Sequence, residues 1–225
     1  MINLKPLVVG ISGYSGVGKS TIIYELSKIL GPSVICLFFD DYVSRSDFPV
    51  NIKDWIQDGA NPNVIKTPIL REHLKALVQG RSVIAPISNG WAKEHLDRES
   101  IRTINPGKII LLEEPFGRER EEIKDLIDIV IYLDVPLEIA LARRILDLNK
   151  SQELRNDPMV LINLLDHFLI EYLYNGVRDM YFEIGNKIKN NCDTVINATQ
   201  ELAQIIEDIM NYLKDYKVFD CIIRK

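Results

Sequence analysis

The sequence is poor in cysteine, has no excess of basic residues and contains no long apolar run. Its three cysteines, Cys36, Cys192 and Cys221, are odd in number and far apart, which argues against a disulfide framework or a cysteine-rich metal site. The net charge of −5 argues against a nucleic-acid surface, which needs clustered Lys and Arg. No apolar segment approaches the ~18 residues of a membrane span. We therefore expect a cytoplasmic protein with neither nucleic acid nor membrane as its partner.

What the sequence does contain is an alternation of short apolar runs and amphipathic stretches, which is typical of a parallel sheet covered by helices. At 225 residues, of which 47% are hydrophobic, the chain suits a single domain over 1–225. We expect a three-layer α/β/α fold with a mostly parallel sheet of five or six strands. The expected strands are 6–12, 34–39, 82–87, 108–112, 127–134 and 194–197, and the expected helices are 18–30, 68–79, 119–125, 136–148, 158–188 and 199–214.

Three polar segments interrupt this alternation. Residues 40–66 are rich in Asp, Asn, Pro and Gly, and residues 88–106 are similar, so we expect both to be loops that contact a substrate. The segment at 147–158 separates two expected helices and is expected to form a small mobile lid. In open α/β sheets ligands bind beyond the carboxyl ends of the strands, where these loops gather.

The most specific pattern is G-x-x-x-x-G-K-[ST] between an expected strand and an expected helix, which is typical of a phosphate-binding (Walker A) loop. Its glycines let backbone N–H groups surround an anion beside the positive end of the helix. Lys19 would then reach the β- and γ-phosphates of ATP, and Ser20 would bind Mg²⁺. The alternative is a glycine-rich turn that matches by chance. The residues expected to hold the nucleotide are Gly13, Ser15, Gly16, Val17, Gly18, Lys19, Ser20 and Thr21.

Acidic residues follow two of the expected strands. Asp40 comes first after the second strand, where we expect it to take the proton of an acceptor hydroxyl and to help hold Mg²⁺ through water. Asp41 and Tyr42 beside it are expected to contact the substrate. Glu113 ends the fourth strand and is expected to order the metal or a substrate hydroxyl. The alternatives are an Asx turn at Asp40 and a solvated acidic pair at Glu113 and Glu114.

Basic side chains on two later segments complete the candidate set. Arg143 and Arg144 lie beside the apolar stripe of the helix at 136–148, where they would stabilise charge on the transferring phosphoryl group when the lid closes. An ordinary exposed arginine is the alternative for one of the two. His95 and Arg98 fall in the loop at 88–106 and are substrate-contact candidates, although a lone histidine there is more often a surface residue. His73 and His167 lie in helical patterns near no motif.

These residues together resemble the uridine kinase and phosphoribulokinase group of P-loop kinases, which also holds pantothenate and nicotinamide riboside kinases. The matching pieces are residues 13–21, 39–42, 61–62 with 70–74, 83–86, 112–113, 133–134 and 142–145. The resemblance implies a P-loop kinase fold, ATP with Mg²⁺, Asp40 as catalytic base, and Arg143 and Arg144 approaching the phosphates from the lid.

The acceptor side departs from that family. Where the family has an acid-rich stretch before the substrate helix, this chain has residues 60–66, which contain no acid. Where the family has Tyr-Asp after the third strand, this chain has Ser88 and Asn89. The Arg-Asp that ends the family's lid helix is replaced by Asp147 and Leu148. His95 falls near the family's substrate-contacting histidine. Lost hydrogen-bonding acids change which acceptor binds, so uridine itself is not the expected substrate.

We expect a phosphotransferase that moves the γ-phosphoryl group of ATP to a hydroxyl of a small molecule, either a nucleoside or a related metabolite. The alternative is a nucleotide-binding ATPase or regulatory module without small-molecule transfer. A nucleoside-monophosphate kinase is disfavoured because residues 40–66 contain one arginine, Arg45. A guanine-selecting switch is disfavoured because Ser151 follows Asn149 and Lys150 without the Asn-Lys-x-Asp pattern. The amphipathic stretch at 199–214 packs on its own sheet or on a second subunit, which leaves a homo-oligomer as an alternative.

Overall fold

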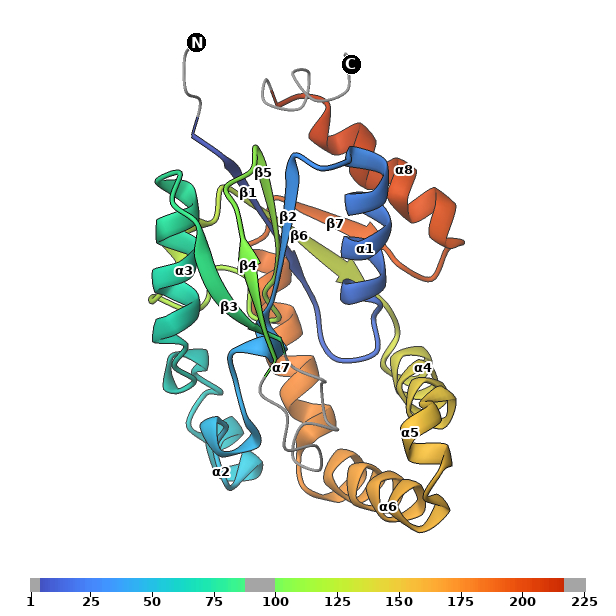
Figure 1. The fold of residues 1–225 in the computed structure, drawn as a ribbon. Helices are drawn as coiled ribbons and strands as arrows, with labels where there is room; N and C mark the ends of the chain where they lie inside the picture. The colour runs from blue at the N-terminus through green and yellow to red at the C-terminus, as the bar shows by residue number, and fades with distance from the viewer. Residues whose placement is uncertain (1–4, 88–99, 217–225) are drawn as a thin grey trace.

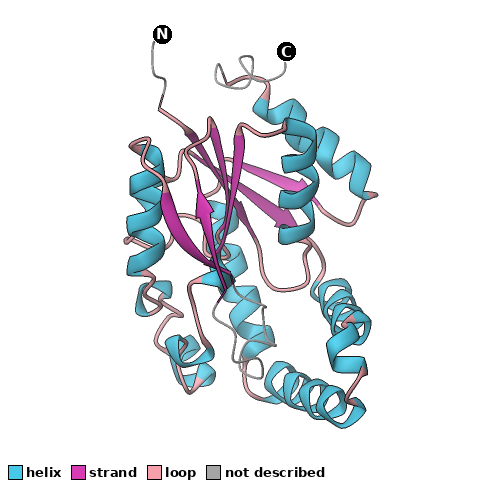
Figure 2. Cartoon of the chain, viewed as in Figure 1, coloured by secondary structure: helices cyan, strands magenta, loops and turns pink. Residues whose placement is uncertain are grey.

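A five-stranded parallel sheet forms the centre of the computed structural model, which describes residues 5–87 and 100–216 (Figures 1 and 2). Its strand order is β2-β5-β1-β6-β7, with every neighbouring pair parallel. These strands are β1 (Leu7–Ser12), β2 (Val34–Phe38), β5 (Ile109–Glu113), β6 (Ile129–Asp134) and β7 (Thr194–Asn197). The expected mostly parallel sheet of five strands is confirmed. β1 and β5 are buried along their whole length, as parallel strands covered on both faces require.

Helices cover both faces of the sheet and make three layers (Figure 1). Val9 and Ile11 of β1 pack into a core with α1 (Lys19–Leu30) and α8 (Leu202–Leu213). Val8, on the other face, belongs to a second core with α3 (Pro68–Val78) and α7 (Val177–Asn190). Alternate residues of one strand thus supply both cores, because successive side chains of a strand point to opposite faces.

The register of the sheet gathers the strand ends that carry the predicted site. Ile11 of β1 and Phe38 of β2 both lie opposite Glu113 of β5. Parallel strands share a direction, so the residues that follow β1 and β2 meet Glu113 at one edge. The phosphate-binding loop, the acids after β2 and the acid that ends β5 therefore share this edge.

The third expected strand lies outside the main sheet. β3 (Val83–Ile87) pairs antiparallel with β4 (Ser100–Ile104) in a separate two-stranded sheet. Pro86 has no N–H to donate to a ladder, which favours a strand at an edge. The prediction of a loop over 88–106 is wrong at β4, where β-branched Ile and Thr residues favour a strand. Residues 88–99 of that loop lie outside the described residues.

The remaining helices correct several predicted boundaries. The expected helix 158–188 is two helices, α6 (Pro158–Tyr174) and α7, because Gly176 between them has a φ of +92°. The expected helix 119–125 is a turn followed by a 3₁₀ helix (Lys124–Leu126). The segment at 147–158 is largely helical, since α4 (Leu137–Lys150) runs into it and α5 (Gln152–Arg155) follows.

The segment at 40–66 is not an open loop. It contains α2 (Ile52–Gln57) and three short 3₁₀ helices at Phe39–Asp41, Arg45–Asp47 and Pro62–Val64. The Asn51 side chain caps α2 by accepting from the backbone N–H groups of Lys53 and Asp54. In the part of the chain that the structure describes, none of the helices has the length and apolar character needed to span a membrane.

Candidate active site

The loop between β1 and α1 has the backbone shape that its sequence predicts. Gly13, Gly16 and Gly18 have φ values of +136°, +86° and +102°, in the region that glycine adopts without strain. A Cβ on Gly16 would lie 2.2 Å from the carbonyl oxygen of Ala140, so only glycine fits where the loop meets α4. A Cβ on Gly18 would meet nothing within 4 Å, which leaves that side of the loop open.

Two side chains at the start of α1 converge on Glu113. The Ser20 hydroxyl donates to Glu113 Oε2 at 2.7 Å, and Lys19 Nζ lies 3.7 Å from Glu113 Oε1. Lys19 Nζ also donates to the Tyr14 carbonyl oxygen at 3.2 Å. Lys19 is only 8% exposed and Glu113 only 5%. The start of α1 and the end of β5 therefore form one buried polar cluster.

The electrostatics of this cluster follow from its burial. Burial raises the pKa of the Glu113 carboxyl, the Lys19 ammonium lowers it, and the Asp40 carboxylate raises it again. Asp40 is exposed in the first 3₁₀ helix after β2, yet it is near enough to act electrostatically on Glu113. Both predicted strand-end acids thus lie at the phosphate loop, one buried and one facing solvent.

Asp41 and Tyr42, predicted substrate contacts, also contact neighbouring elements of the chain. Asp41 Oδ2 lies 3.6 Å from Arg102 Nη2 of β4, and the same guanidinium donates to the Cys36 carbonyl oxygen at 3.1 Å. The hydroxyl of Tyr42 lies 3.1 Å from His73 Nδ1 of α3 in a hydrogen bond. The fold therefore brings His73 to the Asp40 turn, although the sequence placed it near no motif.

The predicted arginine pair of α4 divides between two neighbours. Arg143 Nη1 donates to the carbonyl oxygens of Ala198 at 3.0 Å and of Val17 in the phosphate loop at 3.4 Å. Arg144 acts on Tyr181 of α7: burial raises the pKa of that phenol to about 12, and the Arg144 guanidinium opposes the rise. Both arginines are half-buried, so the ordinary exposed arginine expected for one of them is wrong.

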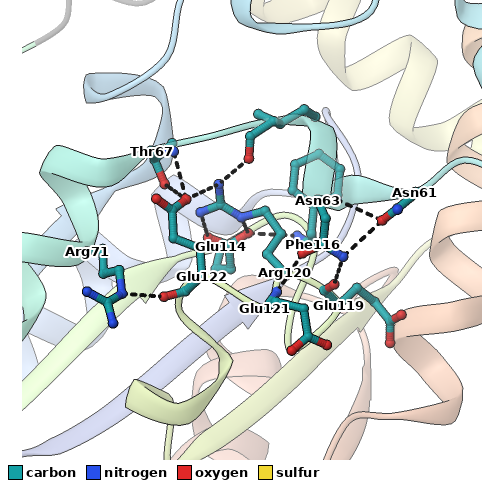
Figure 3. Close-up of polar contacts among 11 residues, drawn as sticks. Asn61, Asn63, Thr67, Arg71, Glu114, Phe116, Glu119, Arg120, Glu121 and Glu122 are labelled. Carbon is teal, nitrogen blue, oxygen red and sulfur yellow. Dashed lines mark hydrogen bonds and ion pairs between the residues drawn. The ribbon is translucent and has the colours of Figure 1, made fainter.

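Glu114, next to Glu113, belongs to a buried ion pair that the sequence did not reveal (Figure 3). Arg120 Nη2 and Nε donate to the two oxygens of Glu114 at 2.8 and 3.1 Å, and its guanidinium lies 5.0 Å from the centre of the Phe39 ring. The alternative of a solvated acidic pair is therefore wrong. The segment expected as the helix 119–125 instead contributes Arg120 to this ion pair. Arg120 lies over the ring of Phe39, the residue before Asp40.

Residues 119–122, in the segment after β5, form hydrogen bonds with residues just before α3 (Figure 3). Asn63 Oδ1 accepts from the Glu121 backbone N–H at 2.7 Å, and its Nδ2 donates to the Glu119 carbonyl oxygen at 3.1 Å. Thr67 N–H donates to Glu122 Oε2 at 2.8 Å. Asn61 and Asn63, in the stretch that lacks the family's acids, therefore make structural hydrogen bonds within the chain.

Sequence reasoning missed several of these residues. Arg102 had a readable signal, since Ile101, Thr103 and Ile104 around it favour a strand. Tyr181 had no local signal, because it reaches the phosphate loop only through the packing of α7. His95 and Arg98, predicted substrate contacts, lie outside the described residues.

The side-chain oxygens of Ser20 and Glu113 are suitable ligands for a magnesium ion that binds together with nucleotide phosphates. Mg²⁺ prefers oxygen ligands and is usually held by one or two protein groups together with phosphate and water oxygens. A hydroxyl and a carboxylate oxygen 2.7 Å apart, beside an open glycine loop, match that ligand type.

A phosphate loop at the carboxyl edge of a five-stranded parallel sheet, with acids on two strand ends, defines the P-loop kinase class. A model of the phosphoribulokinase / uridine kinase family matches residues 8–150, and the chain belongs to this family. It is therefore a phosphotransferase that acts on a hydroxyl acceptor.

Individual relatives are similar over much of their length. A uridine kinase from Clostridium tetani is 28% identical over 193 residues, which cover 85% of this chain and 87% of that protein. A uridine kinase from Shewanella amazonensis is 30% identical over 144 residues, or 62% of this chain and 67% of that protein. The solved structure of a possible uridine kinase from Bacillus stearothermophilus has a TM-score of 0.52 at 23% identity, over 87% of this chain and 90% of that chain, and shares its fold.

Proposed function

We propose that the chain transfers the γ-phosphoryl group of ATP, with Mg²⁺, to a hydroxyl of a nucleoside or a related small metabolite. The observation that carries this proposal is the 2.7 Å hydrogen bond between Ser20 and Glu113, beside Lys19 and within electrostatic reach of Asp40. It joins the donor-binding loop to an acid on a neighbouring strand, which is the arrangement that phosphoryl transfer needs.

Each residue has a role in this proposal. Backbone N–H groups from Gly16 to Lys19 hold the phosphates, and the Lys19 ammonium neutralises their charge. Ser20 and Glu113 hold the metal, with Asp40 assisting through water. A bound Mg²⁺ would neutralise charge that develops on the phosphate oxygens.

The chemical step is an in-line displacement. The acceptor oxygen forms a bond to the γ-phosphorus, the bond from that phosphorus to the ADP oxygen breaks, and the hydroxyl proton passes to Asp40. Arg144 stabilises charge on the transferring group, and Arg143 does so from its place against the phosphate loop. Asp41, Tyr42, His95 and Arg98 remain the proposed contacts of the acceptor.

The acceptor is proposed as nucleoside-like because the named relatives are uridine kinases. The chain nevertheless differs on the acceptor side, where Asn61 and Asn63 make internal hydrogen bonds. A site without the family's acids rejects acceptors that depend on those hydrogen bonds. We therefore expect uridine to be a poorer acceptor than another nucleoside, sugar or vitamin alcohol.

The test is ADP release by the pure protein with ATP, Mg²⁺ and a panel of nucleosides, sugars and vitamin alcohols. One acceptor should stimulate release, and Asp40→Asn should lower kcat by about 10²- to 10⁴-fold while ATP still binds. Asp215→Asn, the same change at an exposed position near the end of α8, should leave kcat unchanged.

The internal bonds of Asn61 and Asn63 also favour one other function, a nucleotide-binding module without small-molecule transfer. Tight ATP binding without acceptor-stimulated ADP release across the whole panel would overturn the kinase proposal and support that module.

A further inference from the structure

A tyrosine of the phosphate loop packs against a tyrosine of α7. The ring of Tyr14, the second residue of the loop pattern, stacks on Tyr181 of α7 with centroids 5.3 Å apart and planes 15° from parallel. The Tyr14 hydroxyl donates to the Val135 carbonyl oxygen just before α4. The backbone carbonyl oxygen of Tyr14 accepts from Lys19 Nζ at 3.2 Å. One loop residue thus contacts α7, the start of α4 and the phosphate-binding lysine.

The phenol of Tyr181 also lies among charged groups of the site. Burial raises the pKa of this phenol to about 12, Arg144 lowers it and Asp40 raises it, so both of these charged groups lie within electrostatic reach. The phenol therefore stays protonated at neutral pH, among groups that the proposed transfer uses.

The position of Tyr181 is fixed by the close approach of α7 to the sheet. A Cβ on Gly185, one turn after Tyr181, would lie 2.7 Å from the Tyr132 hydroxyl and 3.8 Å from Tyr14 Cδ1. Glycine at this position lets α7 lie directly against β6 and the phosphate loop, since any larger residue would push the helix outward.

A third tyrosine extends the contact to α6. The rings of Tyr172 and Tyr181 are 6.1 Å apart, and the Tyr172 hydroxyl lies 3.5 Å from the Leu137 carbonyl oxygen at the start of α4. Tyr172 is 4% exposed, so this contact is part of the packed interior. Tyr181 therefore packs between Tyr14 of the phosphate loop and Tyr172 of α6.

We propose that Tyr181 is a positioning residue for the nucleotide: its ring fixes Tyr14, so the loop holds its phosphate-binding shape before ATP arrives. This inference rests on the proposed function and deepens it. A loop that is already ordered loses less conformational entropy when the ligand binds, so the effect of Tyr181 belongs to donor affinity.

The test measures Mg·ADP affinity by calorimetry and steady-state kinetics with ATP. Tyr181→Leu, which removes the stacked ring, should weaken Mg·ADP binding by about 2- to 10-fold, and Tyr181→Phe, which keeps the ring, by less than about 2-fold. The KM for ATP should rise by the same factors with kcat little changed, because the lost contact acts on binding. Tyr212→Phe, a similar change on α8, should alter neither quantity.

A double-mutant cycle separates this role from general destabilisation. With Tyr14→Leu already present, Tyr181→Leu should weaken Mg·ADP binding by less than about 2-fold, because its stacking partner is gone. An equal loss in both backgrounds, or no loss in either, would overturn the proposal. Binding is measured without acceptor, so an absence of transfer to any acceptor would overturn the proposed function alone. A chain that binds no nucleotide would overturn both.

Discussion

At the residue scale, the site depends on one buried carboxylate that serves two partners. Glu113 accepts from Ser20 with one oxygen and faces Lys19 with the other. Burial penalises its ionised form, and the Lys19 ammonium is the nearest charge that offsets the penalty. Lys19 and Glu113 therefore depend on each other, and a change of either alters the electrostatics of the whole cluster.

His73 gives a prediction about pH. Burial lowers its pKa, and Glu72 opposes this weakly, so the unfolded chain binds a proton at higher pH than the folded chain. The free energy of unfolding should therefore hold steady above the ordinary histidine pKa of about 6.5 and fall as the pH drops through the lowered value. Urea unfolding at a series of pH values measures this.

The matched variant is His73→Gln, which keeps a hydrogen-bonding group for Tyr42 but does not titrate. The difference in unfolding free energy between wild type and variant should change with pH below about 6.5. A difference that stays constant over this range would contradict the assignment.

At the element scale, Arg120 and Glu114 form a buried ion pair within the segment that follows β5 (Figure 3). Their side chains are 1% and 0% exposed. Arg120 Nη1 also donates to the carbonyl oxygen of Ile65, just before α3, at 3.2 Å. The chain needs this pair because Glu114 follows Glu113 directly, and a second buried acid requires its own cation.

Removing one partner of this pair should be strongly destabilising. Arg120→Met leaves the Glu114 carboxylate buried and unpaired, which should lower the free energy of unfolding by about 3–5 kcal/mol. Arg120→Met with Glu114→Leu should recover much of the loss, because no unpaired charge is left. Arg178→Met, which breaks an exposed ion pair, should change the unfolding free energy by less than about 1 kcal/mol. Chemical denaturation of the four proteins decides this, and an equally stable Arg120→Met would refute it.

The sequence predicts the elements whose residues carry their own pattern. β2 and β5 are apolar runs that acids follow or end, and this pattern predicts Asp40 and Glu113 at the sheet edge. A glycine inside a helical pattern is a signal for the break at Gly176, which the expected single helix over 158–188 does not contain. Arg102, His73 and Tyr181 could not be assigned, because their contacts arise when elements far apart in the chain pack together.

At the scale of the whole molecule, the nucleotide is expected to stabilise the fold. The phosphate loop contacts α4 through Gly16 and α7 through Tyr14, so a ligand in the loop acts on elements from both halves of the chain. Ligands that bind only the folded state stabilise it by mass action.

Mg·ADP at about 100 times its Kd should add about 2.7 kcal/mol and raise Tm by about 5–10 °C. Lys19→Ala should lose most of this shift, whereas Lys28→Ala, at an exposed position on the same helix, should keep it. Thermal unfolding followed by fluorescence measures both, and an unchanged wild-type Tm with Mg·ADP would count against a nucleotide site.

The β3–β4 hairpin is separate from the five-stranded sheet that carries the phosphate loop. Its strands pair with each other, and Arg102 joins the hairpin to the Asp41 turn. Mutations and insertions in the hairpin therefore leave every hydrogen-bonded ladder beneath the phosphate loop intact. We expect a hairpin grafted from a relative to leave Mg·ADP binding unchanged.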